Sequence, residues 1–263
     1  MAAADGSRTT SPRANTLAVS TVIFALRPRG AGSAGSGLPN APVLWVPLVC
    51  RTRDPFVDQW ALPGGWLSSE EELGLAASRT LRETTGLAPH YLEQLFTFGD
   101  LDRSPGDRVV SIVYWALVQP TEADRATVDD NVRWFAADAL PALAFDHNKI
   151  VAYALWRLRT KMEYSRIAQA FLGTSFTLAQ LRGVHEAVLL RPLDPANFRR
   201  SMEASGTLID TGERVAGARH RPPRLYRYSA TGPESDASAP PLLFPPAAPI
   251  ASYEELSHDD RIR

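Results

Sequence analysis

The fold is decided by residues 64–87, which read GGWLSSEEELGLAASRTLRETTGL. Apolar residues in the second half recur at helical spacing and predict an amphipathic helix. They are Leu73, Ala76, Ala77 and Leu81. Ser69 and Glu72 have the spacing of a capping box at the start of this helix, and Gly86 suits the left-handed position after its end. The stretch therefore predicts a glycine-containing turn, a helix and a second turn.

The same residues resemble the Nudix box, a loop–helix–loop that binds a divalent metal and a nucleoside diphosphate in that family. The family pattern is Gly, five residues, Glu, seven residues, then Arg-Glu-u-x-Glu-Glu-x-Gly-u, with u aliphatic. The positions in register are Gly65, Glu71, Arg79, Leu81, Glu83, Gly86 and Leu87. Two acidic positions instead hold Thr80 and Thr84. The resemblance implies a Nudix-type site that has lost part of its metal-binding residues.

Positions 80, 83 and 84 lie on one helix face, where an intact box gathers its carboxylates. Mg²⁺ prefers carboxylates and phosphate oxygens, and here Glu83 remains with Glu71 more distant. We therefore expect at most weak Mg²⁺ binding at Glu83 and Glu71, impaired water activation and no required cofactor. The box residues Gly65, Glu71, Arg79 and Glu83 are interpreted as vestigial rather than catalytic.

Diphosphate binding can survive this loss, because the glycine turn at 64–65 lets backbone approach a phosphate closely. Nearby arginines supply positive charge, and Trp60, Trp66 and Phe98 offer rings for stacking on a base or, alternatively, for core packing. The predicted ligand-binding residues are Arg51, Arg53, Trp60, Gly64, Gly65, Arg79 and Glu83. For Arg79 the alternative is a simple ion pair with Glu71 or Glu83.

Three further segments resemble ADP-ribose-type Nudix proteins. They are FTFGD at 96–100, RVVS at 108–111 and AFDH at 144–147. Within the last segment, His147 is interpreted as a helix-start residue capped by Asp146 rather than as a catalytic group.

Around the box, apolar runs at 17–26, 43–51, 95–98 and 109–118 predict strands, and residues 148–162 have helical spacing. Strands mixed with a loop–helix–loop give an α/β fold, which the resemblance makes a Nudix-type α/β/α sandwich. We expect a disordered N-terminus at 1–15, a Nudix-like domain at 16–161, a second domain at 162–229 and a Pro-rich flexible tail at 230–263.

The second domain has the element order of a winged helix-turn-helix. Thr177 with Gln180 predicts a capping box. Asp194 followed by Pro195 predicts the start of the next helix. Residues 208–211 and 225–228 are then expected to pair as a hairpin around a basic loop. The domain class is therefore one that places a helix in the major groove of DNA.

Residues 162–229 contain ten Arg against six Asp or Glu, which favours a polyanionic partner. On the second helix, Asn197 and Arg200 are predicted to face outward with Arg199 on the flank, residue types that read bases and phosphates. The predicted DNA-binding residues are Asn197, Arg199, Arg200, Arg214, Arg219, His220, Arg221 and Arg224. The plain alternative is a solvated basic surface.

The degraded box, FTL at 176–178, RPLD at 191–194, NFRR at 197–200 and HRPPRLYRY at 220–228 together resemble the Nudix-related transcriptional regulators of NAD metabolism. The resemblance covers roughly residues 16–229. It implies a homodimeric repressor of NAD biosynthesis or salvage genes, released from double-stranded operator DNA by ADP-ribose or a related metabolite. One alternative is an active Mg²⁺-dependent ADP-ribose pyrophosphatase, with Asp100 or Glu93 completing the metal site. Another is an RNA- or protein-binding module.

Composition is compatible with this interpretation. The net charge is −1, and Cys50 is the only cysteine, so neither an internal disulfide nor a cysteine metal cluster can form. No apolar run approaches the roughly 18 residues of a membrane span. We expect a cytoplasmic protein without a membrane partner. The operator sequence and the regulated genes do not follow from the sequence.

Overall fold

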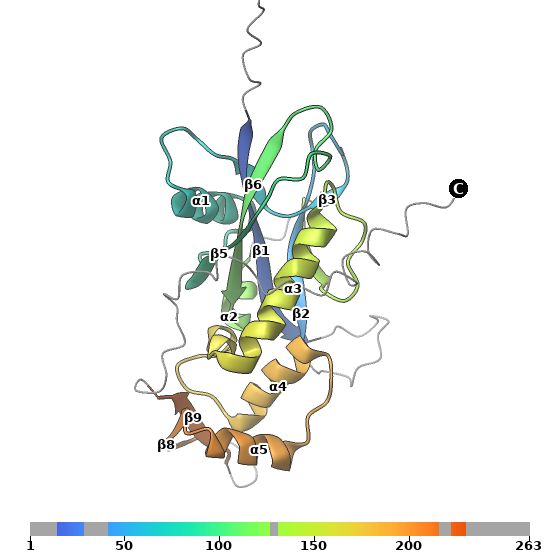
Figure 1. Ribbon diagram of the computed structural model, residues 1–263. Coiled ribbons are helices and arrows are strands. Elements are labelled where there is room, and N and C mark those ends of the chain that lie inside the picture. The colour runs from blue at the N-terminus through green and yellow to red at the C-terminus, as the bar shows by residue number, and fades with distance from the viewer. Residues whose placement is uncertain (1–14, 29–41, 127–130, 216–221, 230–263) are drawn as a thin grey trace, which may run out of the picture. The chain divides into compact units, whose positions relative to one another are not determined.

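The computed structural model describes residues 15–28, 42–126, 131–215 and 222–229 (Figure 1). The predictions of a disordered N-terminus and a flexible tail at 230–263 concern residues outside these ranges, apart from residue 15. Within them, no helix is both long and apolar enough to cross a membrane.

A mixed seven-stranded sheet organises the first part of the chain. Its strands are β1 (Thr16–Pro28), β2 (Pro42–Cys50), β3 (Trp60–Ala61), β4 (Gly64–Trp66), β5 (Tyr91–Phe98), β6 (Val109–Val118) and β7 (Val132–Ala136). The order is β3-β2-β1-β6-β5, with β4 paired to β1 and β7 paired to β2. β1 and β6 run parallel, whereas the other pairs are antiparallel. The predicted strands are confirmed, and β5 is longer than predicted because a bulge between Gln94 and Phe96 interrupts its alternation.

Helices cover both faces of this sheet, because side chains along its central strands are buried alternately on the two sides. In β1, Val22 and Phe24 belong to one apolar cluster with α3 (His147–Tyr164). Ile23 belongs to another, with Leu81 of α1 (Leu73–Thr85) and Ala123 of α2 (Pro120–Ala123). Fully burying one such side chain contributes about 2–3 kcal/mol. The predicted α/β/α sandwich is therefore confirmed.

The second part of the chain is a short helical unit closed by a hairpin. It comprises η1 (Ile167–Phe171), α4 (Leu178–Leu189), α5 (Pro195–Ala204), β8 (Leu208–Arg214) and β9 (Arg224–Tyr228). The capping box is formed, with the Gln180 N–H donating to Thr177 Oγ1 at 3.1 Å. Asp194 caps α5 by accepting the Asn197 N–H at 2.8 Å. These local predictions of the winged helix-turn-helix are confirmed.

The core continues from the sheet into α4. Leu181, Val184 and Val188 of α4 lie in the same apolar cluster as Phe24 of β1, so the two parts share buried surface. The Arg159 Nε–H of α3 also donates to the Val188 carbonyl at 3.0 Å. Residues far apart in the chain therefore connect the sandwich directly to the helix that precedes α5.

Two local predictions are wrong. The helix of the box begins only at Leu73, after Glu72, which makes no side-chain cap, so Ser69 and Glu72 do not form a capping box. Gly64 and Gly65 form β4 rather than a turn. Gly86, in contrast, adopts the left-handed conformation at φ 69° and donates its N–H to the Arg82 carbonyl, as predicted.

Candidate functional site

The carboxylates of the box are both paired with one arginine. Arg79 donates to the two oxygens of Glu71 at 2.8 and 2.7 Å and to Glu83 at 3.2 Å. The hydrogen bond from Arg79 lowers the pKa of Glu71, and the same bond is the main reason that the pKa of Arg79 is raised. The ion-pair alternative for Arg79 is thus confirmed, and the two predicted metal ligands face a guanidinium.

The two threonines of the box bond to their own helix. The Thr80 hydroxyl is buried and donates to the Ala76 carbonyl at 2.8 Å, while the Thr84 hydroxyl donates to the Thr80 carbonyl at 2.6 Å. Such bonds to the preceding turn satisfy a Ser or Thr within a helix. Across the described ranges, no group of three or more His, Cys, Asp or Glu is placed to hold a metal. Of the acidic positions of the box, only Glu71 and Glu83 keep a carboxylate, and both are paired with Arg79.

The alternative carboxylates do not complete such a site. Glu93 of β5 instead accepts from Lys161 Nζ at 2.7 and 2.9 Å and from the Tyr91 hydroxyl. Within the described residues, Asp100 belongs to no group of three or more possible metal ligands.

The glycine pair has a packing role in β4. A Cβ placed at Gly64 would lie 2.6 Å from the Val19 carbonyl oxygen, and one at Gly65 would lie 3.1 Å from Thr80 Cγ2. The first distance leaves no room for a side chain, since the atom in contact is backbone. Close contact with β1 therefore explains Gly64 better than the predicted approach to a phosphate.

Two other predicted ligand-binding residues, Arg51 and Arg53, make contacts within the protein itself. Arg51 Nε donates to the Pro55 carbonyl at 2.8 Å, and its guanidinium lies 4.7 Å from the Phe145 ring. Burial lowers the pKa of Arg51. Arg53 is exposed and accepts a bond from Arg51 through its backbone carbonyl. Arg51 therefore holds the loop that leads to β3.

The candidate aromatic residues differ in exposure. Trp60 packs edge-on against Phe135 at 5.0 Å, as core packing predicts. Phe98 contacts Phe96 and Tyr153 at 5.6 and 5.8 Å. Trp66, in contrast, is 64% exposed. Trp66 is therefore the most accessible of the three predicted stacking residues.

A buried ion pair at the start of α3 has no signal in the sequence. Arg103 donates to both oxygens of Asp146 at 3.0 and 2.8 Å, and the two side chains are 4% and 8% exposed. Asp146 therefore makes no side-chain cap for α3, contrary to prediction. His147 is buried, accepts the Leu62 N–H at Nδ1 at 3.0 Å, and has its pKa lowered to about 4 by burial. No local sequence signal joins residues 43 positions apart.

Helix α5 presents its polar residues to solvent, and none of its ten residues is buried. Asn197 and Arg200 are exposed and bonded to each other, as their helical positions predict. Arg199 pairs with Glu203 at 2.8 Å. Phe198 packs edge-on against His185 of α4 at 5.2 Å and orients the helix.

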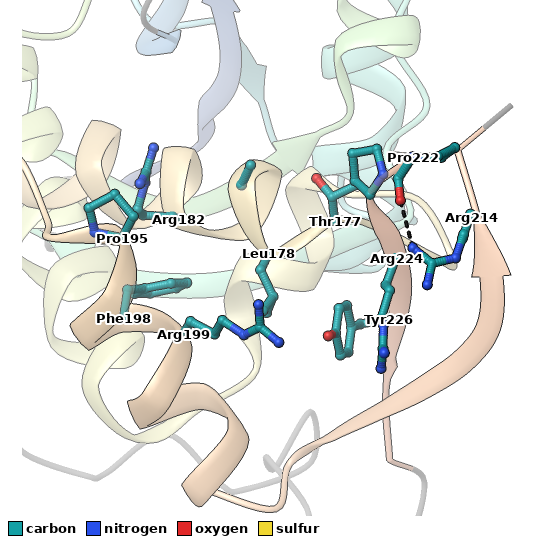
Figure 2. Close-up of a pocket in the computed structure, with 12 residues that line it drawn as sticks. Thr177, Leu178, Arg182, Pro195, Phe198, Arg199, Arg214, Pro222, Arg224 and Tyr226 are labelled. Atoms are coloured by element: carbon teal, nitrogen blue, oxygen red, sulfur yellow. Dashed lines mark hydrogen bonds between the residues drawn. The ribbon is translucent and has the colours of Figure 1, made fainter. Parts of the chain in front are cut away.

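A groove of about 400 Å³ lies between α4, α5 and the hairpin (Figure 2). Four arginines line it: Arg182, Arg199, Arg214 and Arg224. Arg214 donates to the Pro222 carbonyl at 2.8 Å, and Arg224 pairs with Asp210 at 2.7 Å. The structure thus brings three predicted residues together and adds Arg182 and Tyr226, which the sequence did not single out. Arg219, His220 and Arg221 lie outside the described residues.

A Nudix-type sandwich followed by an exposed helix and a basic hairpin defines a two-domain protein with a winged-helix DNA-binding part. Residues 41–154 match the model of the NUDIX domain, and residues 168–228 match that of the NrtR DNA-binding winged helix domain.

Two relatives match across most of the chain. The chain is 33% identical over 192 residues to the ADPR responsive transcriptional repressor NtrR of Acinetobacter baylyi, covering 71% of this chain and 76% of that protein. The crystal structure of Shewanella oneidensis NrtR matches with a TM-score of 0.66 and 34% identity over 81% of this chain and 94% of that one. Its complex with a 27mer DNA matches with a TM-score of 0.64 and 32% identity over 81% and 93%. The chain therefore belongs to the NrtR family of transcriptional repressors.

Proposed function

We propose that the chain represses genes of NAD biosynthesis or salvage. As a homodimer in the cytoplasm, it binds double-stranded operator DNA through α5 and the β8–β9 hairpin. ADP-ribose, or a related NAD metabolite bound to the Nudix domain at about 16–161, releases the operator. The Acinetobacter relative named as ADPR responsive supports the effector, and the Shewanella relative crystallised with DNA supports the partner.

The observation that carries the DNA proposal is the exposure of α5. This capped helix has no buried residue and lies beside an arginine-lined groove, and Phe198 and Met202 anchor it by packing against the core. Its free face offers Asn197 and Arg200. Asn suits bidentate reading of adenine and Arg suits guanine or phosphate, so this face suits the major groove.

The proposed effector site is a receptor rather than a catalyst. Thr80 and Thr84 bring no negative charge, and Glu71 and Glu83 are held by Arg79. A sensor requires that its ligand stay intact. A box that does not gather several carboxylates is poorly suited to hold the metal that activates water, so it meets this requirement. We therefore propose that Mg²⁺ is not required for effector binding.

We infer that the contacts of α4 couple effector binding to DNA binding. Arg159 of α3 donates to the Val188 carbonyl near the end of α4, and Glu186 accepts the Leu193 N–H at 2.9 Å in the turn before α5. These two bonds fix the α4–α5 turn from both sides. A shift of α3 on effector binding would therefore reorient α5 and favour a dimer whose two helices no longer match successive major grooves.

Fluorescence anisotropy tests this proposal, with the 27mer DNA of the Shewanella oneidensis complex as the labelled duplex. We expect the wild-type chain to bind the duplex and ADP-ribose to release it at constant salt concentration. AMP at the same concentration serves as the control for a nonspecific nucleotide effect. A complex that persists at saturating ADP-ribose would contradict the effector assignment.

A further inference from the structure

The groove between α5 and the hairpin combines cations with a hydroxyl group. Arg199 extends from α5 toward the hydroxyl end of Tyr226, and Arg224 lies beside the same ring on β9 (Figure 2). Tyr226 is only 8% exposed, so its ring is fixed in the wall of the groove. Glu203 is the main cause of the raised pKa of Arg199, and Tyr226 contributes less. The three side chains form one polar cluster.

The first turn of α4 adds to this positive environment. Thr177, Leu178 and Ala179 line the groove, and α4 is 12 residues long. The N-terminal end of a helix carries partial positive charge and unpaired backbone N–H groups, which favour anions. Groups that can bind an anion therefore face the groove from three sides, from α4, α5 and β9.

We propose that this groove seats one phosphate of the DNA backbone, held by Arg199, Arg224 and the Tyr226 hydroxyl. The inference rests on the proposed function. If α5 enters the major groove and the hairpin approaches the adjacent minor groove, the phosphate strand between these grooves passes between α5 and the hairpin. The groove lies in that position.

Two carboxylates compete with this phosphate. Glu203 pairs with Arg199 at 2.8 Å and Asp210 pairs with Arg224 at 2.7 Å, and all four side chains are at least 36% exposed. In free protein these pairs keep the arginines ordered and locally neutral. A phosphate must displace both carboxylates, so Glu203 and Asp210 lower the affinity for any DNA. Because affinity for all DNA is lowered, contacts of α5 with the bases contribute a larger share of the preference for the operator over other DNA.

Anisotropy at several salt concentrations tests the phosphate seat, using the 27mer DNA and a scrambled duplex of equal length and composition. We expect Arg224→Gln to weaken binding to both duplexes about tenfold and Tyr226→Phe about fivefold. Arg224→Gln also reduces the slope of log K against log salt by about 0.9. Arg227→Gln is the matched control, since Arg227 is exposed on β9 but does not line the groove.

The competing carboxylates are tested in the same assay. Glu203→Gln and Asp210→Asn each increase affinity for both duplexes about two- to fivefold. Glu70→Gln removes an equal charge from an exposed position outside this groove and serves as the control.

If Arg224→Gln and Tyr226→Phe behave like Arg227→Gln, the phosphate seat is wrong while the proposed repressor stands. If the wild-type chain binds neither duplex at low salt, the proposed function itself fails.

Discussion

Helices α1 and α5 each carry a candidate site, but their packing differs. α1 buries five residues against the sheet, including Thr80, whereas α5 buries none. Side chains of α1 that would serve catalysis in an intact box thus help to hold the fold. Side chains of α5 are available to a partner. The difference supports the proposed division of roles, in which the Nudix part binds the effector and the exposed helix binds DNA.

Ion pairs in the two regions differ in the same way. Arg103 and Asp146 in the Nudix part are almost completely buried, whereas Arg199 and Glu203 on α5 are 59% and 47% exposed. Burying a charge costs several kcal/mol unless it is paired, whereas an exposed pair contributes little. Removing one member of the first pair is therefore costly, whereas the second pair can exchange partners.

Removing one arginine from each pair should give the largest contrast. Arg103→Met leaves the Asp146 carboxylate buried without its partner and should lower the free energy of unfolding by about 3–5 kcal/mol. Arg199→Met, the exposed counterpart, should change it by less than about 1 kcal/mol. Urea unfolding followed by circular dichroism measures both. Equal effects would contradict the distinction between the two regions.

Acid should destabilise the folded protein through its buried histidines. Burial lowers the pKa of His147 to about 4, below its ordinary value of 6.5, so the unfolded chain binds a proton more readily. The stability that His147 provides at neutral pH is therefore lost as pH falls from about 6.5 toward 4, amounting to about 2 kcal/mol at pH 5. His185 of α4, whose pKa is likewise lowered to about 4, is less buried and should contribute less.

The measurement is the free energy of unfolding between pH 7 and pH 5 for wild type, His147→Gln and His185→Gln. His147→Gln should show the weakest dependence on pH, whatever its absolute stability. An unchanged dependence in both variants would mean that other groups determine the acid sensitivity.

Base reading by α5 should produce an intermediate effect. Asn197→Ala should weaken binding to the 27mer DNA by about 1.5 kcal/mol, roughly tenfold, and leave the scrambled duplex nearly unaffected. Calorimetric affinity for ADP-ribose should remain that of wild type, because Asn197 is confined to the exposed face of α5. Equal losses on both duplexes would assign Asn197 to phosphate contact instead.

The smallest predicted effect is on the coupling between ADP-ribose binding and DNA binding. Arg159→Ala removes the bond from α3 to the Val188 carbonyl. The change in DNA affinity caused by ADP-ribose should fall by about 1 kcal/mol, or roughly fivefold. Lys149→Ala, exposed near the other end of α3, is the matched control. Unchanged coupling in Arg159→Ala would direct attention to another route, such as the shared apolar core.

Periodic patterns predicted the main strands of the sheet and both helices of the winged domain, and local residue types predicted the caps at Thr177 and Asp194, because these features depend on neighbours in sequence. The sandwich architecture followed from the resemblance to the Nudix family. Features that depend on distant residues were not predicted. Gly64 is required by contact with Val19, and Asp146 is taken by Arg103 rather than capping α3. The groove with Tyr226 likewise appears only when α4, α5 and β9 come together.

The central claim is that the Nudix part senses ADP-ribose without consuming it. The most direct test follows DNA anisotropy and AMP formation in one sample of protein, labelled 27mer DNA, Mg²⁺ and ADP-ribose. We expect the DNA to be released while no AMP accumulates above the protein-free control. AMP forming in proportion to protein would show an active pyrophosphatase instead, and DNA remaining bound at saturating ADP-ribose would contradict the sensor.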